Sequence, residues 1–356
     1  MTLETQRYRS LIRLNENSVR FTLVDSKISA NVEAIGRLSG IDYVEIEHGV
    51  YSDDASNLIQ LSMKHRQLKE IVHSLAIHGF HAFAATGTMT KFVSQHEIGN
   101  LWHKVRAGEY TQSPDGVVHT LEYDRDHRVE ALLVVFSSMA DTYNKSSLMR
   151  FFEQNFKSVN KHVPERVAVL RIADIGGVVG GFYMPTTFDP EAGSKVQNLI
   201  ASTMRKLDIA PERTVLYGAS KGGTGALYHA LRGKLHCVAV DPVVHDSYYE
   251  SRYQDSHWTG GLLFPQSKQD AFTDLAAALT SEHRTIAIVT SPGSPLWDSI
   301  SDFSNKIPEE KLRLIVSYDP KITDHPHVSQ QTLKTVTGLI NVGLAGLDVG
   351  GGLTKI

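Results

Sequence analysis

Cysteine is almost absent from this sequence: Cys237 is the single cysteine among 356 residues, and it lies in the apolar run Cys237–Val240. One cysteine excludes a disulfide bond within the chain. Apolar runs are short, so no segment has the uninterrupted length of a membrane span. The polar N-terminus also lacks the apolar core of a signal peptide. We therefore expect a cytoplasmic protein that does not cross a membrane.

The chain also lacks a large excess of charge of either sign, since the formal net charge is −3 and no dense basic run occurs. This balance argues against a dedicated nucleic-acid-binding protein. Apolar residues make up 41% of the chain and charged residues 21%, which is typical of a globular protein with a sizeable core. No internal repeat or low-complexity segment is present. The length favours one large domain with an extension, or two domains.

The most informative segment is Tyr217–Gly223, with the sequence Y-G-A-S-K-G-G. A buried strand is predicted before it and a helix after it, so Ser220 lies on a sharp strand-to-helix turn with the G-x-S-x-G pattern of a nucleophile elbow. Gly218 and Gly222 are expected where strand and helix pass too closely for side chains. We predict that Ser220 is a catalytic nucleophile. The simpler alternative is a serine that only caps the helix.

The region from Ser113 onward has a regular strand–helix alternation. Strands are predicted at Val117–Tyr123, Val129–Phe136, Arg166–Ile172, Thr214–Tyr217, His236–Val240, Thr285–Thr290 and Leu312–Ser317, and helices at Leu148–Val159, Ala192–Leu207, Thr224–Leu231, Asp270–Leu279, Ile300–Lys306 and Thr332–Ala345. This order predicts an α/β fold with a mostly parallel sheet covered by helices on both faces. With the elbow it predicts an α/β-hydrolase-like catalytic domain over residues 114–356.

Residues 1–113 are expected to form a separate N-terminal α+β region of unknown role. Strands are predicted at Arg20–Leu23 and Tyr43–Ile46, and a helix with an apolar stripe at Ser56–His78. This stripe has to be buried against another surface. The region would either shape or cover the substrate pocket, or pack on the far side of the molecule or form a homo-oligomer contact.

A serine nucleophile needs a base and an orienting carboxylate, which follow it in the order acid then histidine in α/β-hydrolases. The acid is expected in the loop after the strand Thr285–Thr290, where Asp298 is the first carboxylate and Asp302 lies one helical turn later. Asp241, directly after the strand His236–Val240, is the rival position. Asp298 is the preferred candidate, and its alternative role is to cap the helix that follows.

The histidine is expected between the last strand and the last helix, where His325 and His327 stand two residues apart. Ser329 is interpreted as the cap of the last helix. This favours His325 slightly, because a catalytic histidine usually lies at some distance from a helix cap. A zinc site at the His-x-His pair is disfavoured, since no third ligand has suitable spacing.

The oxyanion hole is predicted from the amide of Lys221, next after the serine, and an amide of Ser138 or Met139 in the loop after the strand Ala131–Phe136. The side chain of Lys221 is expected either to meet an anionic group of the substrate or to be solvated. Asp174–Gly181 lacks the G-x-G-x-x-G spacing of a dinucleotide loop and is interpreted as a mobile rim of the active site. Gly350–Gly352 is interpreted as a frayed tail.

The segment Gly218–Tyr228 (G-A-S-K-G-G-T-G-A-L-Y) resembles the XcbB/CpsF family of capsular polysaccharide biosynthesis proteins. More distantly, residues 116–345 are similar to serine-dependent acyltransferases of accessory secretion systems and to capsule O-acetyltransferases with α/β-hydrolase folds. The resemblance implies a Ser–Asp/Glu–His triad, carried here by Ser220, Asp298 and one of His325 or His327. The N-terminal region is not covered by it.

The function expected from these observations is acyl transfer through a Ser220 acyl-enzyme, either O-acetyl transfer to a carbohydrate or hydrolysis of such an ester. No bound cofactor is expected, and acetyl-CoA or another acyl donor would be a co-substrate. The alternative is a non-catalytic hydrolase-fold scaffold that binds a peptide or a capsule-assembly partner. A peptidase is disfavoured because no substrate-sizing domain is evident.

Overall fold

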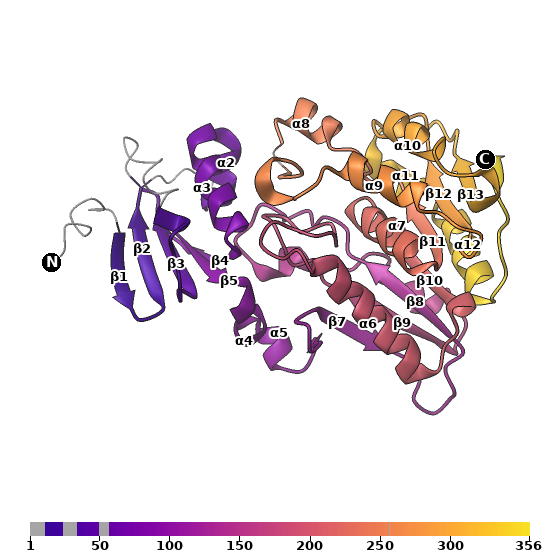
Figure 1. Cartoon of the computed structure of the whole chain (residues 1–356), viewed down its shortest axis with the longest axis horizontal. Coiled ribbons are helices and arrows are strands. Elements are labelled where there is room, and N and C mark those ends of the chain that lie inside the picture. Colours follow the sequence, from indigo (N-terminus) through magenta and orange to yellow (C-terminus); the bar gives the residue numbers. More distant parts are fainter. Residues whose placement is uncertain (1–10, 24–33, 50–56, 256) are drawn as a thin grey trace.

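The computed structural model of the chain describes residues 11–23, 34–49, 57–255 and 257–356. The strands form two sheets, one of five strands near the N-terminus and one of nine strands built from the rest of the chain. Figure 1 shows the molecule as elongated, with the small sheet at one end and the large sheet with its helices at the other. In the order of the chain, the strands are β1 Leu11–Asn15, β2 Ser18–Thr22, β3 Tyr43–Glu47, β4 Phe80–Thr86, β5 Met89–Ser94, β6 Thr111–Gln112, β7 Val118–Glu122, β8 Ala131–Phe136, β9 Val167–Ile172, β10 Thr214–Ala219, β11 His236–Val240, β12 Ile286–Thr290, β13 Leu312–Val316 and β14 Gly352–Lys355.

Among the described residues, the α-helices range from 4 to 16 residues in length. They are α2 Leu58–Lys64, α3 Arg66–Ile77, α4 Ile98–Leu101, α5 His103–Arg106, α6 Ala192–Leu207, α7 Lys221–Gly233, α8 Ser247–Tyr253, α9 Lys268–Ala277, α10 Trp297–Ser304, α11 His325–Gln331 and α12 Leu333–Leu344.

The large sheet has the strand order β14-β13-β12-β11-β10-β8-β9-β7-β6. Neighbouring strands from β14 to β9 pair in parallel, and β7 and β6 continue the sheet in antiparallel pairing. Every residue of β8 through β12 is buried. Parallel strands buried on both faces have near-continuous apolar sequences, which is why these strands are predictable. This is the predicted α/β-hydrolase-type fold.

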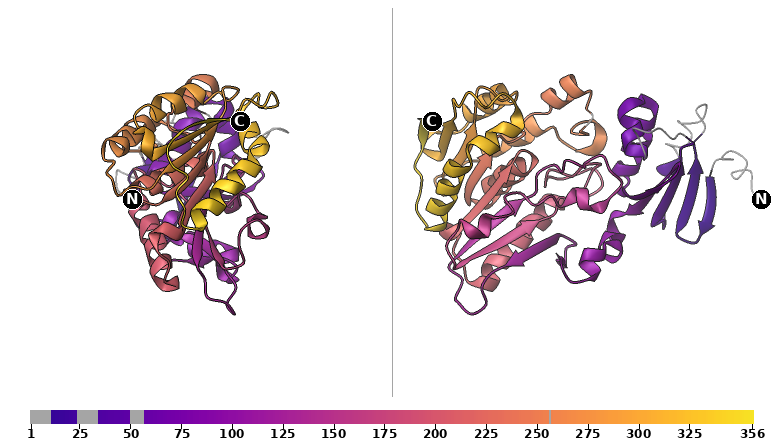
Figure 2. Two further views of the ribbon diagram at one scale, coloured as in Figure 1. Left: turned by 90° about the vertical axis from the view of Figure 1, so that its right-hand side faces the viewer. Right: turned by 180° about the vertical axis from the view of Figure 1, so that it is seen from behind.

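Helices cover both faces of the large sheet, as the two views of Figure 2 show. On one face, the cluster that contains Leu132, Leu216 and Cys237 includes residues of α6, α7, α9 and α10. On the other face, alternate residues of the same strands pack with α11 and α12. Because the strands run parallel, the carboxyl ends of β8, β10, β11 and β12 lie at one edge of the sheet, where ligands bind in such folds.

The N-terminal part shares its hydrophobic cores with the rest of the chain. The cluster formed by β2, β3, α2, α3 and β4 also contains Val178, Val179, Trp258 and Leu263. A further cluster joins Ile98 and Trp102 to residues of β7 and of the segment that follows β9. Two stretches outside the N-terminal part, residues 178–179 and 258–263, therefore contribute to a core built mainly from N-terminal residues. The division of the chain at residue 113 stays a prediction.

Two of the predicted helices differ from the observed structure. The helix expected at Ser56–His78 begins outside the described residues and is divided at His65, which is extended between α2 and α3. Leu148–Val159 contains single 3-10 turns at Leu148–Phe151 and from Val159 in place of a helix. Its apolar residues serve two separate cores, so they do not form one helical face.

The glycine-rich tail is also not frayed, contrary to the prediction. Residues from Gly352 form β14, which pairs in parallel with β13 at the edge of the sheet. A Cβ atom on Gly351 would lie 1.9 Å from the carbonyl oxygen of Glu309, so the chain can pass there only as glycine.

Candidate active site

Ser220 occupies the turn between β10 and α7 with φ 56° and ψ −125°. A positive φ is costly for a residue with a side chain and is retained where the surroundings enforce it. A Cβ atom on Gly218 would lie 2.1 Å from the carbonyl oxygen of Gly222, and one on Gly222 would lie 2.5 Å from that of Phe136. Gly218 therefore permits the close contact of strand and helix that the sequence predicted at the elbow. Gly222 permits the close approach of α7 to β8, which the sequence did not predict.

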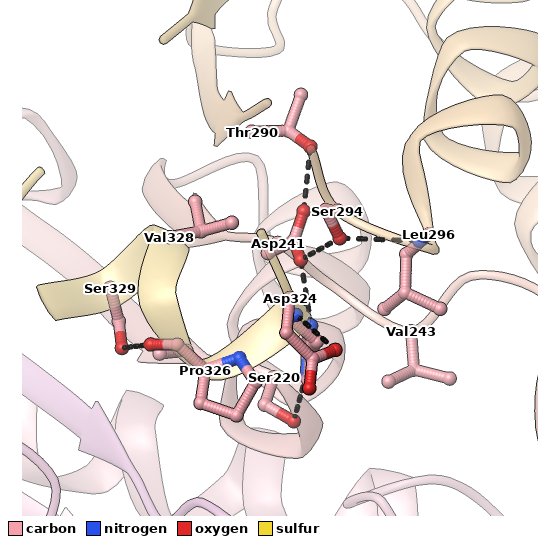
Figure 3. Close-up of polar contacts among 12 residues, drawn as sticks. Ser220, Asp241, Val243, Thr290, Ser294, Leu296, Asp324, Pro326, Val328 and Ser329 are labelled. Atoms are coloured by element: carbon pink, nitrogen blue, oxygen red, sulfur yellow. Dashed lines mark hydrogen bonds and ion pairs between the residues drawn. The ribbon is translucent and has the colours of Figure 1, made fainter. Parts of the chain in front are cut away.

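His325 connects Ser220 to Asp241. Its Nε2 atom lies 2.6 Å from Ser220 Oγ and its Nδ1 atom 2.7 Å from Asp241 Oδ2. With the Nδ1–H tautomer, the ring donates to the carboxylate and accepts from the serine hydroxyl. Figure 3 shows Ser220 and Asp241 among the polar contacts of this site. The arrangement has the connectivity of a nucleophile, a base and an orienting acid.

The carboxylate at this position is Asp241 and not Asp298, which corrects the sequence-based preference. Asp241 follows β11 directly, is 1% exposed, and accepts a hydrogen bond of 2.6 Å from Thr290 Oγ1 and another from Ser294 Oγ. Asp298 is an exposed residue in the first turn of α10. The loop after β12 thus contributes a hydroxyl that holds the acid rather than the acid itself (Figure 3).

Of the two histidines, the structure brings His325 to Ser220. His325 is the first residue of α11, whose cap is Asp324: the Asp324 carboxylate accepts a hydrogen bond of 2.7 Å from the amide of His325. The Nδ1 atom of His327 lies 3.2 Å from Thr323 Oγ1. Ser329 lies inside α11, so its interpretation as a helix cap is wrong, and the expected distance between histidine and helix start is not observed. Pro326 after His325 fixes the first helical turn.

Ser220 lines a cavity of about 440 Å³. Ser138 and Met139, the predicted oxyanion-hole residues, line this cavity together with Ser220 and His325. Ser138 is tied to the elbow because its hydroxyl donates a hydrogen bond of 3.1 Å to the carbonyl oxygen of Ala219. Lys221 is the first residue of α7, and first-turn amides of a helix have no acceptor within it. These amides are the groups available to an oxyanion.

The side chain of Lys221 neither reaches a substrate position nor is solvated, contrary to both expectations. It is fully buried, and its Nζ atom lies 2.8 Å from Asp174 Oδ2 and 3.3 Å from the carbonyl oxygen of Val179. Asp174 also accepts hydrogen bonds from the amides of Gly181, Phe182 and Tyr183. The predicted mobile rim at residues 174–181 is thus a buried turn fastened to the residue after the nucleophile.

Three aromatic residues that the sequence analysis did not single out line the same cavity: Tyr143, Tyr249 and His257. The rings of Tyr143 and His257 stack with centroids 5.1 Å apart. The ring centroids of Tyr249 and His257 are 4.7 Å apart. Burial lowers the pKa of His257 to about 4, and the nearby His325 acts in the same direction, so His257 is neutral near pH 7. The available signal was the tyrosine pair Tyr248–Tyr249 in the segment that follows β11.

Within the described ranges, no group of three or more His, Cys, Asp or Glu side chains has the arrangement of a metal site. In the same ranges, no helix combines the length and apolar character needed to cross a membrane.

No model of a known protein family matches the chain, and no curated protein sequence matches it. Among solved structures, it is similar to a chain of the Glycosylation Associate Protein (Gap123) complex from Streptococcus agalactiae, with 16% identity, a TM-score of 0.48, and coverage of 71% of this chain and 50% of that one. It thus spans half the length of that chain.

It is also similar to FphF, a fluorophosphonate-binding serine hydrolase of Staphylococcus aureus, with 15% identity, a TM-score of 0.45, and coverage of 65% and 96% of the two chains. For the capsule O-acetyltransferase of Neisseria meningitidis serogroup A the identity is 13%, the TM-score 0.46 and the coverage 65% and 93%. At these identities the similarity concerns the fold alone. The resemblance to the XcbB/CpsF family stays a prediction.

Proposed function

We propose that this chain is a serine-dependent acyl-transfer enzyme that works through a Ser220 acyl-enzyme. The observation that carries the proposal is the continuous hydrogen-bond chain from Ser220 through His325 to the buried Asp241, open to a cavity on the serine side. A helix-capping serine requires none of these contacts. Their combination on a strained elbow supports a nucleophile with its base and orienting acid.

In the acylation step, His325 Nε2 takes the proton of Ser220 Oγ as the oxygen bonds to the acyl carbon. The carbonyl electron pair moves onto its oxygen, which the amides of Lys221 and Met139 or Ser138 would stabilise. The charge of Asp241 stabilises the imidazolium and fixes the tautomer. As the intermediate collapses, the leaving group takes the proton from His325 and departs.

In the second step, His325 removes a proton from an alcohol or water, which attacks the acyl-enzyme. As the bond between the acyl carbon and Ser220 Oγ breaks, His325 returns this proton to Oγ and the free serine is restored. We infer an acetyl or similar acyl group as cargo, with acetyl-CoA or another acyl donor as co-substrate, and a carbohydrate hydroxyl or water as acceptor. The stacked rings of Tyr143 and His257, with Gln330 and Asp141 on the same cavity, supply a flat surface and polar groups suited to a sugar ring.

A fluorophosphonate probe tests the shared chemistry. We expect the folded chain to form one covalent adduct, located at Ser220 by peptide mass spectrometry. Ser220→Ala should abolish the adduct, and Ser251→Ala, which removes an exposed hydroxyl on α8, should not. A folded chain that remains unlabelled would favour the alternative of a non-catalytic scaffold for a peptide or capsule-assembly partner.

Single replacements of the two histidines test the assignment of the base. We expect His325→Ala to lower kcat for p-nitrophenyl acetate by roughly 10⁶-fold, as for loss of a triad base. His327→Ala should keep kcat near that of the parent chain. Acetate release from acetyl-CoA with and without a carbohydrate acceptor, measured in the same preparations, distinguishes transferase from esterase.

A further inference from the structure

A second cavity lies at the carboxyl edge of the large sheet, away from the catalytic serine. It has a volume of about 450 Å³, and its lining includes Val118 at the start of β7, Ala173 directly after β9 and Val196 on α6. Strand β9 is separated from β10 by β8. Among the described residues, the second cavity and the cavity at Ser220 have no lining residue in common. They are therefore two distinct sites along one edge of the sheet.

Apolar residues line the buried part of the second cavity and polar residues its exposed part. Val118, Ala173 and Val196 are buried, whereas Gln112 and Asp115 are exposed. Sites for small molecules combine an apolar surface with a few polar groups that fix the orientation of the ligand, and their volumes are about 300–1,000 Å³. The second cavity has both properties.

Two glycines of the N-terminal part leave space for side chains of this cavity. A Cβ atom on Gly99 would lie 2.0 Å from Gln112 Oε1, and one on Gly79 would lie 2.4 Å from the ring of Phe188. Gln112 and Phe188 both line the cavity, as does His96, whose ring centroid is 5.5 Å from that of Phe188. The N-terminal part and the large sheet thus build the cavity together, and an aromatic pair lies beside it.

The single cation of the cavity is already paired. Lys195 is the only Lys or Arg among the described residues that line it. Its Nζ atom lies 2.8 Å from each carboxylate oxygen of Asp189, which is buried and also accepts a hydrogen bond of 3.3 Å from Gln95 Nε2. The Oε1 atom of Gln95 lies 3.0 Å from His81 Nε2. The charge of Lys195 is therefore balanced, and these polar groups are held in fixed positions.

The polar groups keep hydrogen-bonding capacity for a ligand. Lys195 has three N–H donors, and its contacts with Asp189 use two of them. The side-chain amide of Gln112 donates one hydrogen bond, of 3.3 Å, to the carbonyl oxygen of Gly116 and has a second N–H. The carboxylate of Asp115 has two acceptor oxygens and accepts one hydrogen bond in the described part of the chain.

We propose that the second cavity binds a neutral sugar unit. A sugar presents several hydroxyl groups, and each hydroxyl both donates and accepts hydrogen bonds. Lys195 and Gln112 supply donors to the same cavity to which Asp115 supplies an acceptor. The ring of Phe188 offers an apolar surface to the face of a sugar ring. An anionic ligand is disfavoured, because Asp189 neutralises Lys195 and Asp115 adds negative charge.

The test compares two exposed glutamines, one in each cavity. Gln112 lines the second cavity and Gln330 lines the cavity at Ser220. The probes are the neutral disaccharides maltose, cellobiose, lactose and diacetylchitobiose, titrated to millimolar concentration by calorimetry. We expect one of them to bind, and Gln112→Ala to raise its Kd by about 3- to 10-fold, as for loss of one hydrogen bond. Gln330→Ala should leave this Kd unchanged, and both variants should keep the parent melting temperature.

A second replacement examines the aromatic surface. Phe188→Leu keeps an apolar side chain but removes the ring, and it should also raise the Kd. If the cavity at Ser220 binds the same sugar as an acceptor, it adds a second component to the isotherm that only Gln330→Ala changes. Binding of none of these disaccharides, or binding that Gln330→Ala weakens and Gln112→Ala does not, would overturn the inference. Ser220→Ala should bind the sugar with the Kd of the parent, so the proposed acyl transfer and this site can fail separately.

Discussion

Lys221, the residue next to the nucleophile, forms a buried ion pair with Asp174, with 2.8 Å between Nζ and Oδ2 and side-chain exposures of 0% and 2%. The pair connects the first turn of α7 to the segment after β9, which continues into the core shared with the N-terminal strands. Any shift of residues 174–181 would therefore act on the amide of Lys221 that is proposed to bind the oxyanion.

Removal of one partner of this pair should destabilise the fold. Lys221→Met leaves the Asp174 carboxylate buried without its cation, which typically costs about 3–5 kcal/mol. We expect this decrease in the free energy of unfolding, measured by urea denaturation. Lys195→Met is the matched control, because its pair with Asp189 is partly exposed and should contribute at most about 1 kcal/mol. Equal effects of the two replacements would contradict a structural role for the buried pair.

The identity of the acid can be tested by two replacements of the same kind. Asp241→Asn removes the charge that orients and stabilises the His325 ring, and we expect kcat for an ester substrate to fall by about 10⁴-fold. Asp298→Asn changes an exposed residue of α10 and should leave kcat within a few-fold of the parent value. If Asp298→Asn lowered kcat far more than Asp241→Asn, Asp298 would be the acid, as the sequence predicted.

The difference between these two aspartates shows where sequence reasoning ends. Part of the elbow is a local constraint: Gly218 meets the backbone of Gly222 within one strand–turn–helix unit, so the pattern alone predicts this turn. The space around Gly222 is instead limited by the backbone of Phe136 in β8. The choice of acid depends on the direction of side chains from two neighbouring strands that end at the same sheet edge. Asp241 points toward His325 because Thr290 and Ser294 hold it there, and this information lies in residues far along the chain.

The same distinction applies to the fold. The strands β8 to β13 were predictable because each is a short apolar run in a regular alternation with helices. The position of Tyr249 in the cavity that contains Ser220 was not predictable. It depends on the hydrogen bonds between Thr224 and Val243 and between Asp246 and Lys268, which no short motif encodes. In the N-terminal sheet, the exposed residues of β1 leave no strong alternating pattern, so that strand was missed.

Stability should decrease in acid because of His229 on α7. Burial lowers the pKa of His229 to about 3. The Nε2 atom of the ring lies 2.9 Å from the carbonyl oxygen of Tyr183, and its Nδ1 atom lies 3.0 Å from Gln197 Nε2. In a neutral ring Nε2–H donates to the carbonyl oxygen and Nδ1 accepts from the amide, so these contacts fit the neutral form. In the unfolded chain the pKa is about 6.5. The unfolded state therefore binds more protons below pH 6.5, and stability falls as the pH falls toward 3.

A replacement isolates this contribution. Between pH 6.5 and 4 the free energy of unfolding of the parent chain should fall by about 3 kcal/mol more than that of His229→Gln, measured by urea denaturation at each pH. His127→Gln changes an exposed residue and should show the same decrease in the free energy of unfolding as the parent chain. A His229→Gln chain with the full acid sensitivity of the parent would show that another group is responsible.

The N-terminal region should be required for a working active site, because it anchors the segment that follows α8. Lys69 Nζ on α3 donates hydrogen bonds of 2.6 Å to the carbonyl oxygens of Gln254 and Asp255. Trp258 is fully buried in the cluster formed with α2, α3 and the small sheet. His257, beside Tyr249 in the cavity, is thus next to a residue inserted into the N-terminal core.

A truncated chain that begins at Pro114 would expose Trp258 with Val178, Val179 and Leu263. We expect it to aggregate, or to fold without reacting with a fluorophosphonate at Ser220, since an exposed apolar surface of this kind favours association. In the full chain, Trp258→Ala should lower the free energy of unfolding by about 3–5 kcal/mol, as for loss of a buried aromatic side chain. Lys234→Met, whose partner is the exposed Glu282, is the control and should change it by less than about 1 kcal/mol. If the truncated chain melts cooperatively and labels Ser220 at the full rate, residues 1–113 are an independent domain, and their contacts with Gln254, Asp255 and Trp258 do not position the active site.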